Sequence, residues 1–113
     1  MQISSDIIRG HLDGIILKLL IEKDCYGYEI AALIKAQSAD TFTIKEATLY
    51  AVVQRLEKRE MITSYIGTKS KGGQRRYYKI TTFGKAYFKE KLDEWKTLKT
   101  LMAQLMEDDN ESN

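Results

Sequence analysis

TIKEATLYAVVQRLEK, the stretch from Thr43 to Lys58, decides how the rest of the chain can be interpreted. Leu49, Val53 and Leu56 recur at i, i+4 and i+7, which places them on one face of a helix for burial. The first residue of the stretch, a threonine, and Glu46 have the S/T-x-x-E spacing of a capping box at a helix start. The stretch therefore predicts an amphipathic helix that begins at this box.

The other face of this predicted helix is small, polar or basic. It carries Lys45, Thr48, Tyr50, Ala51, Gln54, Arg55 and Lys58. Such groups suit the major groove of DNA, where they meet base edges and phosphates. We therefore expect DNA contacts from Lys45, Thr48, Tyr50 and Gln54. Two alternatives stay open, namely an ordinary amphipathic surface helix and a place for Tyr50 in the core.

The totals limit what the 113-residue chain can be. Its length suits one domain with a modest core. The longest apolar run, at residues 15–21, is broken by Lys18 and is too short to span a bilayer. The N-terminus lacks the pattern of a signal peptide, and the single cysteine, Cys25, fits a reducing cytoplasm. We therefore expect a cytoplasmic protein without a membrane partner.

Catalytic and metal chemistry are not indicated. One histidine and one cysteine are too few soft ligands for a typical zinc site, and no cofactor is expected. His11 has no serine or cysteine nucleophile beside it in a recognisable pattern, and no glycine-rich phosphate loop follows a strand. The sequence therefore predicts that the chain is not an enzyme and that His11 is a packing or surface residue.

The charge of the chain is segregated along the sequence. Residues 1–43 carry 4 basic and 6 acidic groups, residues 44–91 carry 12 and 4, and residues 92–113 carry 2 and 6. The middle segment is thus at +8, although the whole chain is only at +2. A localised basic region is the electrostatic footprint of polyanion binding. The alternative is a solvated basic surface.

Two helices are predicted before the focal stretch. Residues 4–22 have an apolar stripe of period 3.6, with Ser4 or Ser5 as the cap. Gly10 and Gly14 interrupt it, either to let another helix approach or as tolerated blemishes. A polar turn follows, in which Cys25 is a small buried residue. Residues 26–37 then read as a second helix that turns Ile30, Leu33 and Ile34 inward, which together with the focal helix makes a helix-turn-helix.

After the focal helix the period changes to two, which predicts strands at residues 62–67 and 75–80. In the first strand Ile62, Ser64 and Ile66 share one face. The connecting loop contains Gly72 and Gly73, which supply the positive φ values of a hairpin turn. This cationic hairpin is interpreted as the wing of a winged helix. The phosphate contacts are expected from Lys69, Lys71, Arg75 and Arg76.

A last long helix, capped by Thr81 or Thr82, is predicted to run to about Glu107. Its apolar residues keep a heptad spacing. This seam consists of Phe88, Leu92, Trp95, Leu98, Met102 and Leu105. Because an exposed seam would leave a large apolar patch, we expect a homodimer formed through this helix, with the first helix as a further candidate for the interface.

The predicted fold is mainly α with a small β-hairpin, a winged helix-turn-helix followed by one long C-terminal dimerisation helix. The winged-helix domain is expected at residues 1–81 and the dimerisation helix at 82–107. Residues 108–113 read as a disordered acidic tail.

The order of these pieces resembles the PadR family of bacterial winged-helix transcriptional regulators. The motifs that carry the resemblance are Tyr26–Ile30 (YGYEI), Ala47–Tyr50 (ATLY), Arg55–Glu57 (RLE), Gly73–Tyr78 (GQRRYY) and Ile80–Gly84 (ITTFG). The single helix after Gly84 is similar to the short-form branch. Departures are Ala51 where many members have proline, and Arg59-Glu60 where many have Asp-Gly.

The resemblance implies a dimeric repressor that binds a pseudo-palindromic operator in double-stranded DNA. Trp95 is similar in position to the tryptophan of the small multidrug-sensing members, which implies a flat hydrophobic effector at the dimer interface. Its candidate contacts are Trp95, Leu92 and Asp13. Lys99 stands where those members carry an acidic residue, which counts against cationic drugs. Two alternatives remain, a Trp95 that only packs the dimer and a winged helix that binds protein instead of DNA.

Overall fold

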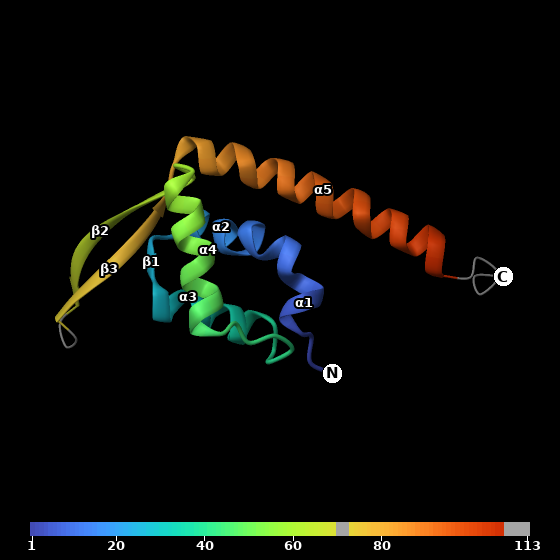
Figure 1. Ribbon diagram of the computed structural model, residues 1–113, viewed down its shortest axis with the longest axis horizontal. Coiled ribbons are helices and arrows are strands. Elements are labelled where there is room, and N and C mark those ends of the chain that lie inside the picture. The colour runs from blue at the N-terminus through green and yellow to red at the C-terminus, as the bar shows by residue number, and fades with distance from the viewer. Residues whose placement is uncertain (70–72, 108–113) are drawn as a thin grey trace.

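Residues 1–69 and 73–107 are described in the computed structural model, the side chain of Lys69 excepted. The elements are α1 (Ser5–Ile8), the 3₁₀ turn η1 (Arg9–His11), α2 (Leu12–Glu22), β1 (Cys25–Tyr26), α3 (Gly27–Gln37), α4 (Glu46–Lys58), β2 (Ile62–Lys69), β3 (Gly73–Ile80) and α5 (Thr82–Met106). The chain measures 58 × 30 × 22 Å, and the β2–β3 hairpin and the end of α5 lie at opposite ends of its long axis (Figure 1). The predicted winged helix with one long C-terminal helix is confirmed.

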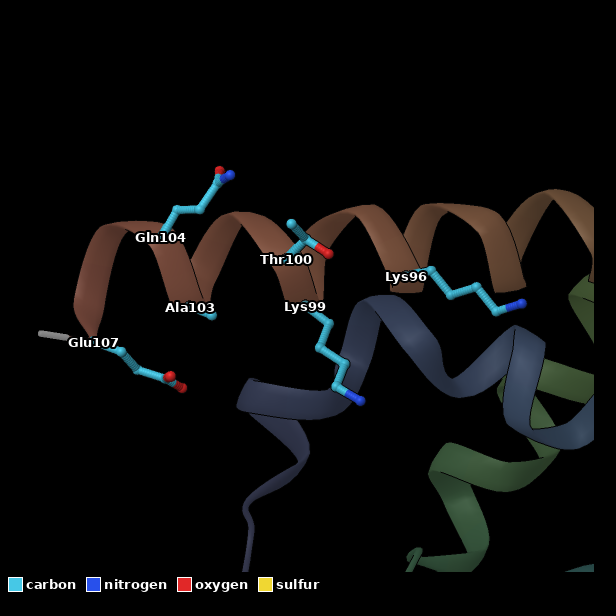
Figure 2. A pocket seen from close by; sticks show the side chains of 6 residues that line it. All are labelled: Lys96, Lys99, Thr100, Ala103, Gln104 and Glu107. Atoms are coloured by element: carbon cyan, nitrogen blue, oxygen red, sulfur yellow. The ribbon is translucent and has the colours of Figure 1, made fainter. Parts of the chain in front are cut away.

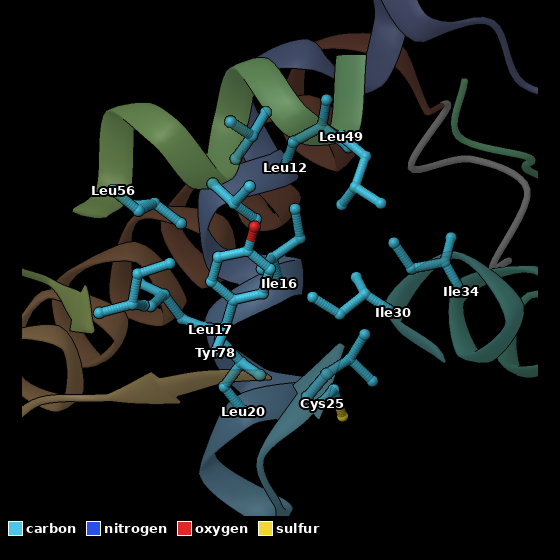
Figure 3. Packing of buried hydrophobic residues seen from close by; sticks show 14 of the residues in the cluster. Leu12, Ile16, Leu17, Leu20, Cys25, Ile30, Ile34, Leu49, Leu56 and Tyr78 are labelled. Carbon is cyan, nitrogen blue, oxygen red and sulfur yellow. The ribbon is translucent and has the colours of Figure 1, made fainter. Parts of the chain in front are cut away.

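The core is built around α2, against which α3, α4 and the sheet pack (Figure 3). Leu12, Ile16 and Leu17 of α2 are at most 1% exposed. The predicted stripe of α4 is buried as expected, since Leu49, Val53 and Leu56 are only 0–2% exposed. Its three residues face α2 because period 3.6 puts them on one side of the helix.

The start of α4 differs from the prediction. The helix begins at Glu46, and its N-cap residue is Lys45, which is extended and makes no side-chain cap bond. The capping box of Thr43 and Glu46 is therefore wrong. The physical reason is burial, because Phe42 and Ile44 are 4% and 5% exposed and hold this segment extended against the core.

The first predicted helix is interrupted. A 3₁₀ turn separates α1 from α2, and Ser4 makes no side-chain cap bond. The two glycines behave differently. A Cβ on Gly14 would lie 3.3 Å from Cβ of Lys91, whereas one on Gly10 would meet nothing within 4 Å. Gly14 thus marks the close approach of α2 to α5, and Gly10 does not.

The sheet has three antiparallel strands in the order β1-β3-β2. The strand β1 was not predicted, because two residues are too few to show a period. Gly73 has φ +71°, as expected for the hairpin, while Gly72 lies outside the described residues. Ile66 lies on the same face of β2 as Ile62, as predicted, but it is 53% exposed whereas Ile62 is 1% exposed. The β2–β3 hairpin projects away from the helices (Figure 1), and Ile66 pairs there with Arg76, which is also exposed.

The junction between β3 and α5 is fixed by Thr81, the predicted cap. Its Oγ1 accepts a hydrogen bond from the Gly84 backbone N–H at 3.0 Å, and its own backbone N–H donates to the Met61 carbonyl at 3.0 Å. A Cβ on Gly84 would lie 2.1 Å from that same carbonyl oxygen, so glycine permits this approach. The acidic tail lies outside the described residues. Among the described helices none is long and apolar enough to cross a bilayer.

Candidate nucleic-acid interface

The outward face of α4 presents the predicted DNA contacts to different degrees. Lys45 and Gln54 are exposed, Thr48 is half-buried, and Tyr50 is 40% exposed. The Tyr50 ring packs against the start of α3, where a Cβ on Gly27 would lie 2.6 Å from its hydroxyl oxygen. Tyr50 is therefore a surface residue with one packed side, and its hydroxyl stands at the junction of α3 and α4.

The hairpin is joined to α4 through Ser64 of β2. Its Oγ donates to Glu57 Oε2 of α4 at 2.6 Å and accepts a hydrogen bond from Arg76 Nη1 at 2.9 Å. The Ser64–Glu57 bond connects the wing with α4, and the Arg76–Ser64 bond connects the two strands of the wing. Arg76, predicted as a phosphate contact, is exposed but already engaged by Ser64.

The opposite face of the sheet carries an aromatic cluster. Tyr65 stacks on Tyr77 with ring centroids 5.6 Å apart, and Tyr26 meets Tyr77 edge to face at 5.5 Å. Arg75 lies over the Tyr26 ring at 5.5 Å. The Tyr65 hydroxyl donates to Asp24 at 2.6 Å, and this bond raises the pKa of Tyr65 to about 12. Alternation along β3 thus places Arg75 and Arg76 on opposite faces of the wing.

The predicted contacts from Lys69 and Lys71 are not placed, since Lys71 and the side chain of Lys69 lie outside the described residues. The described basic groups nevertheless continue from the wing to α4. Lys79 is exposed on β3, and Lys58 is exposed on the last turn of α4. The described positive charge of the middle segment therefore lies mostly at α4 and the wing, the two elements expected to meet DNA, while Lys85, Lys89 and Lys91 lie on α5.

Asp13 is the one charged residue among the described ones that is buried, at 8% exposure. It forms an ion pair with Arg55 of α4, and its second carboxylate oxygen is 3.5 Å from the Tyr87 hydroxyl of α5. Asp13, which the sequence suggested as an effector contact beside Trp95, is thus engaged by these two side chains and is not among the residues that line the apolar groove beside Trp95. Sequence reasoning missed the pair because its two members are 42 positions apart.

An apolar groove of about 910 Å³ lies between the N-terminal helices and α5. It contains five of the six predicted seam residues, while Leu105 is 71% exposed beyond it. His11 packs edge to face on Trp95, with ring centroids 5.8 Å apart, as a packing residue does. The lining is Ile3, Ile7, Ile8, His11, Gly14, Ile15, Lys18, Leu19, Ile34, Gln37, Ser38, Phe42, Phe88, Lys91, Leu92, Trp95, Leu98 and Met102.

A second hollow, of about 530 Å³, follows the outer turns of α5. Figure 2 shows that its side chains, among them Lys96, Lys99 and Gln104, spread away from one another. A ligand site needs a few polar groups that converge, so this hollow is a shallow surface feature. Among the described residues, no group of three histidine, cysteine or acidic side chains could hold a metal ion.

Comparison with known proteins agrees with this geometry. Residues 16–90 match the Transcriptional regulator PadR-like family. A Lysinibacillus sphaericus protein described as uncharacterized is 56% identical over 105 residues, which are 93% of this chain and 96% of that protein. A transcriptional regulator from Clostridium thermocellum has a similar structure, with a TM-score of 0.85, 46% identity, and 93% of this chain and 99% of that chain covered.

A PadR family transcription regulator from Clostridium difficile R20291 superimposes with a TM-score of 0.73 and 38% identity, over 86% of this chain and 99% of that one. A PadR-like regulator from Bacillus cereus gives a TM-score of 0.80 and 26% identity, over 93% and 100%. Between 86% and 93% of this chain is covered in these matches, so the likeness extends beyond the winged helix into α5.

Proposed function

Because the chain belongs to the PadR-like family of transcriptional regulators, we propose that it is a homodimeric repressor whose α4 and wing bind a pseudo-palindromic operator. Family members regulate transcription by binding DNA and are not enzymes.

The observation that carries the proposal is the joined surface of α4 and the hairpin. Lys45 and Gln54 project from the exposed face of α4, whose buried face is anchored in the core. The wing is linked to this helix by the hydrogen bond between Ser64 and Glu57, and Arg76 binds the same serine from the neighbouring strand. A rigid helix with polar and cationic groups suits the major groove, and a basic hairpin beside it suits the flanking phosphates.

A second copy of the chain is the proposed partner of the groove and of α5. Beyond the groove, Leu101, Leu105 and Met106 are 44%, 71% and 74% exposed. Soluble monomers rarely expose contiguous apolar surface on this scale. If α5 of one protomer packed along the groove of the other, the apolar groove and the exposed apolar residues of α5 would both be covered. The two copies of α4 would then be about 34 Å apart, one helical turn of B-form DNA.

Mapping the sites that the purified protein protects on genomic DNA tests the DNA-binding part. We expect a few sites made of inverted half-sites, with centres about 10 base pairs apart. Protection without inverted symmetry contradicts the dimeric mode of binding. Gel shifts at moderate salt separate the alternative of a winged helix that binds only protein, because that alternative predicts no shift of any duplex.

Light scattering of Leu98→Glu tests the dimer. A carboxylate at this half-buried seam position should yield a monomer that has lost its operator affinity. Lys96→Ala is the matched control, since it changes the charge equally on an exposed part of α5 and should stay dimeric. A dimeric Leu98→Glu, or a wild-type monomer at micromolar concentration, contradicts the proposed interface.

We also propose that the two protomers leave a slot between them beside Trp95, that a flat aromatic effector binds in this slot, and that the effector is neutral or anionic. The titratable groups that line the groove are His11, Lys18 and Lys91, and within residues 1–69 and 73–107 no acidic side chain lines it. Cationic compounds would therefore find no partner charge. The alternative is that Trp95 only packs against the second protomer.

The single tryptophan makes the effector proposal measurable by fluorescence. An anionic anilinonaphthalene sulfonate should quench Trp95 and lower operator affinity, whereas a cationic dye of similar size should do so more weakly. No quenching across a broad panel of dyes leaves Trp95 as a packing residue.

A further inference from the structure

The ion pair between Asp13 and Arg55 stands at the point where α2, α4 and α5 meet. Asp13 is 8% exposed, and its two carboxylate oxygens contact different helices, one Arg55 of α4 and the other the Tyr87 hydroxyl of α5 at 3.5 Å. One buried carboxylate thus connects the proposed recognition helix with the proposed dimerisation helix.

The same junction holds α4 at a second position. Arg59, the C-cap residue of α4, lies over the Tyr87 ring at 5.3 Å. Lys91 approaches that ring at 5.4 Å and pairs with Glu94 at 3.3 Å. Arg55 and Arg59 are one helical turn apart, so the last turn of α4 is tied to Asp13 and Tyr87 through two consecutive contacts on the same face.

Directional contacts matter here because the buried core on which these helices pack is almost entirely apolar. Hydrophobic burial is not directional, so an apolar core tolerates small rotations and slides of one helix on another. A charge-assisted hydrogen bond restricts distance and angle, and a buried charge whose partner has been moved is strongly unfavourable. Asp13 therefore selects one orientation of α4 among those that the core would accept.

We infer that Asp13 is a positioning residue, which through Arg55 and Tyr87 fixes the orientation of α4 relative to α5. The relevance for DNA rests on the proposed function. In a dimer held by α5, the angle between α4 and α5 sets the separation of the two α4 helices, and with it the half-site spacing that the protein accepts.

A distance measurement within one chain tests this without DNA. Nitroxide labels at Gln54→Cys on α4 and Gln104→Cys on α5, diluted with unlabelled protein, report the distance between the two helices. Cys25 is fully buried and stays unlabelled. In the doubly labelled parent we expect one narrow distance distribution. Asp13→Asn should broaden it at least about twofold or shift its maximum.

Glu22→Gln is the matched control. Glu22 is also on α2, and its substitution makes the same change from carboxylate to amide. It removes an ion pair in which Lys18 Nζ and Glu22 Oε2 are 2.6 Å apart, and both side chains of this pair are more than half exposed. Because exposed pairs contribute little, Glu22→Gln should leave the distribution unchanged. An unchanged distribution in folded Asp13→Asn overturns the inference.

Arg55→Gln and Tyr87→Phe decide the matter if Asp13→Asn does not fold, since both residues are less buried than Asp13. Broadening of the distance distribution in either variant supports the inference, and parent-like distributions in both overturn it.

Operator binding is measured separately. We expect Asp13→Asn or its substitutes to lose about tenfold in operator affinity and under about twofold in affinity for random duplex. If the wild-type protein protects no site on genomic DNA, the proposed function is refuted, but the distance measurement still tests the positioning role of Asp13.

Discussion

The phenol of Tyr50 on α4 lies directly on the backbone of Gly27, the first residue of α3. A Cβ at Gly27 would lie 2.6 Å from the hydroxyl oxygen, 3.1 Å from Cζ and 3.3 Å from Cε1 of that ring. The two predicted motifs YGYEI and ATLY therefore meet at this contact. The orientation of Tyr50 on the proposed DNA-binding face depends on the absence of a side chain at position 27.

Gly27→Ala should displace the Tyr50 ring. We expect the free energy of unfolding to fall by about 1–3 kcal/mol, the usual effect of overpacking, and operator affinity to fall with it. Denaturant titration and gel shifts measure both. Gly10→Ala is the control, because nothing lies within 4 Å of its Cβ, and it should be neutral or stabilising by up to about 1 kcal/mol. Equal losses in the two variants contradict the contact.

Lys71→Ala with Arg75→Ala should weaken binding to every duplex by a similar factor. Phosphate contacts carry no sequence information, and the slope of log affinity against log salt should drop by about one unit for each phosphate that the protein no longer neutralises. Lys96→Ala with Lys99→Ala removes the same charge at the far end of α5 (Figure 2) and should leave the slope unchanged. Reduced affinity for the operator alone would contradict the phosphate role.

Glu60→Gly should stabilise the protein. Glu60 has φ 63°, in the left-handed region that glycine adopts without strain, and it follows α4 in a Schellman motif. The Met61 N–H donates to the Leu56 carbonyl at 2.9 Å in this motif. Glycine relieves the strain of the left-handed backbone but adds conformational entropy to the unfolded chain. The free energy of unfolding should therefore rise by about 0.5–1 kcal/mol. Ala51→Gly, at an exposed position in the middle of α4, should instead lose about 1 kcal/mol, and a loss from both variants would contradict the strain.

Cys25 should resist thiol reagents in the folded protein. Burial raises the pKa of its thiol from 9.0 to about 11, so at pH 8 only about one molecule in a thousand carries the reactive thiolate. Because the folded pKa is the higher one, the contribution of Cys25 to stability is present below pH 9 and is lost as the pH rises toward 11. Alkylation followed by mass spectrometry should show reaction only in denaturant. Stoichiometric labelling of the native protein within minutes would contradict its burial.

Local pattern by itself determined most of the elements. The stripe Leu49, Val53 and Leu56 gave the buried face of α4, and the change of period after it gave the hairpin. The Thr81 cap at the start of α5 was also readable, because its donor lies only three positions away. Each of these features depends on residues that are close to one another in the sequence. Periodicity and capping patterns can therefore predict them.

Tertiary structure alone decided the rest. The start of α4 moved to Glu46 because Phe42 and Ile44 are drawn into a core whose other members are distant in sequence. Ile66 is exposed because β2 extends past that core, which no alternation could reveal. Asp13 joins Arg55 across 42 positions, since the packing of α2 on α4 brings the two charges together. Sequence patterns report which face of an element is apolar, whereas pairing between elements follows from the way the whole chain closes around its core.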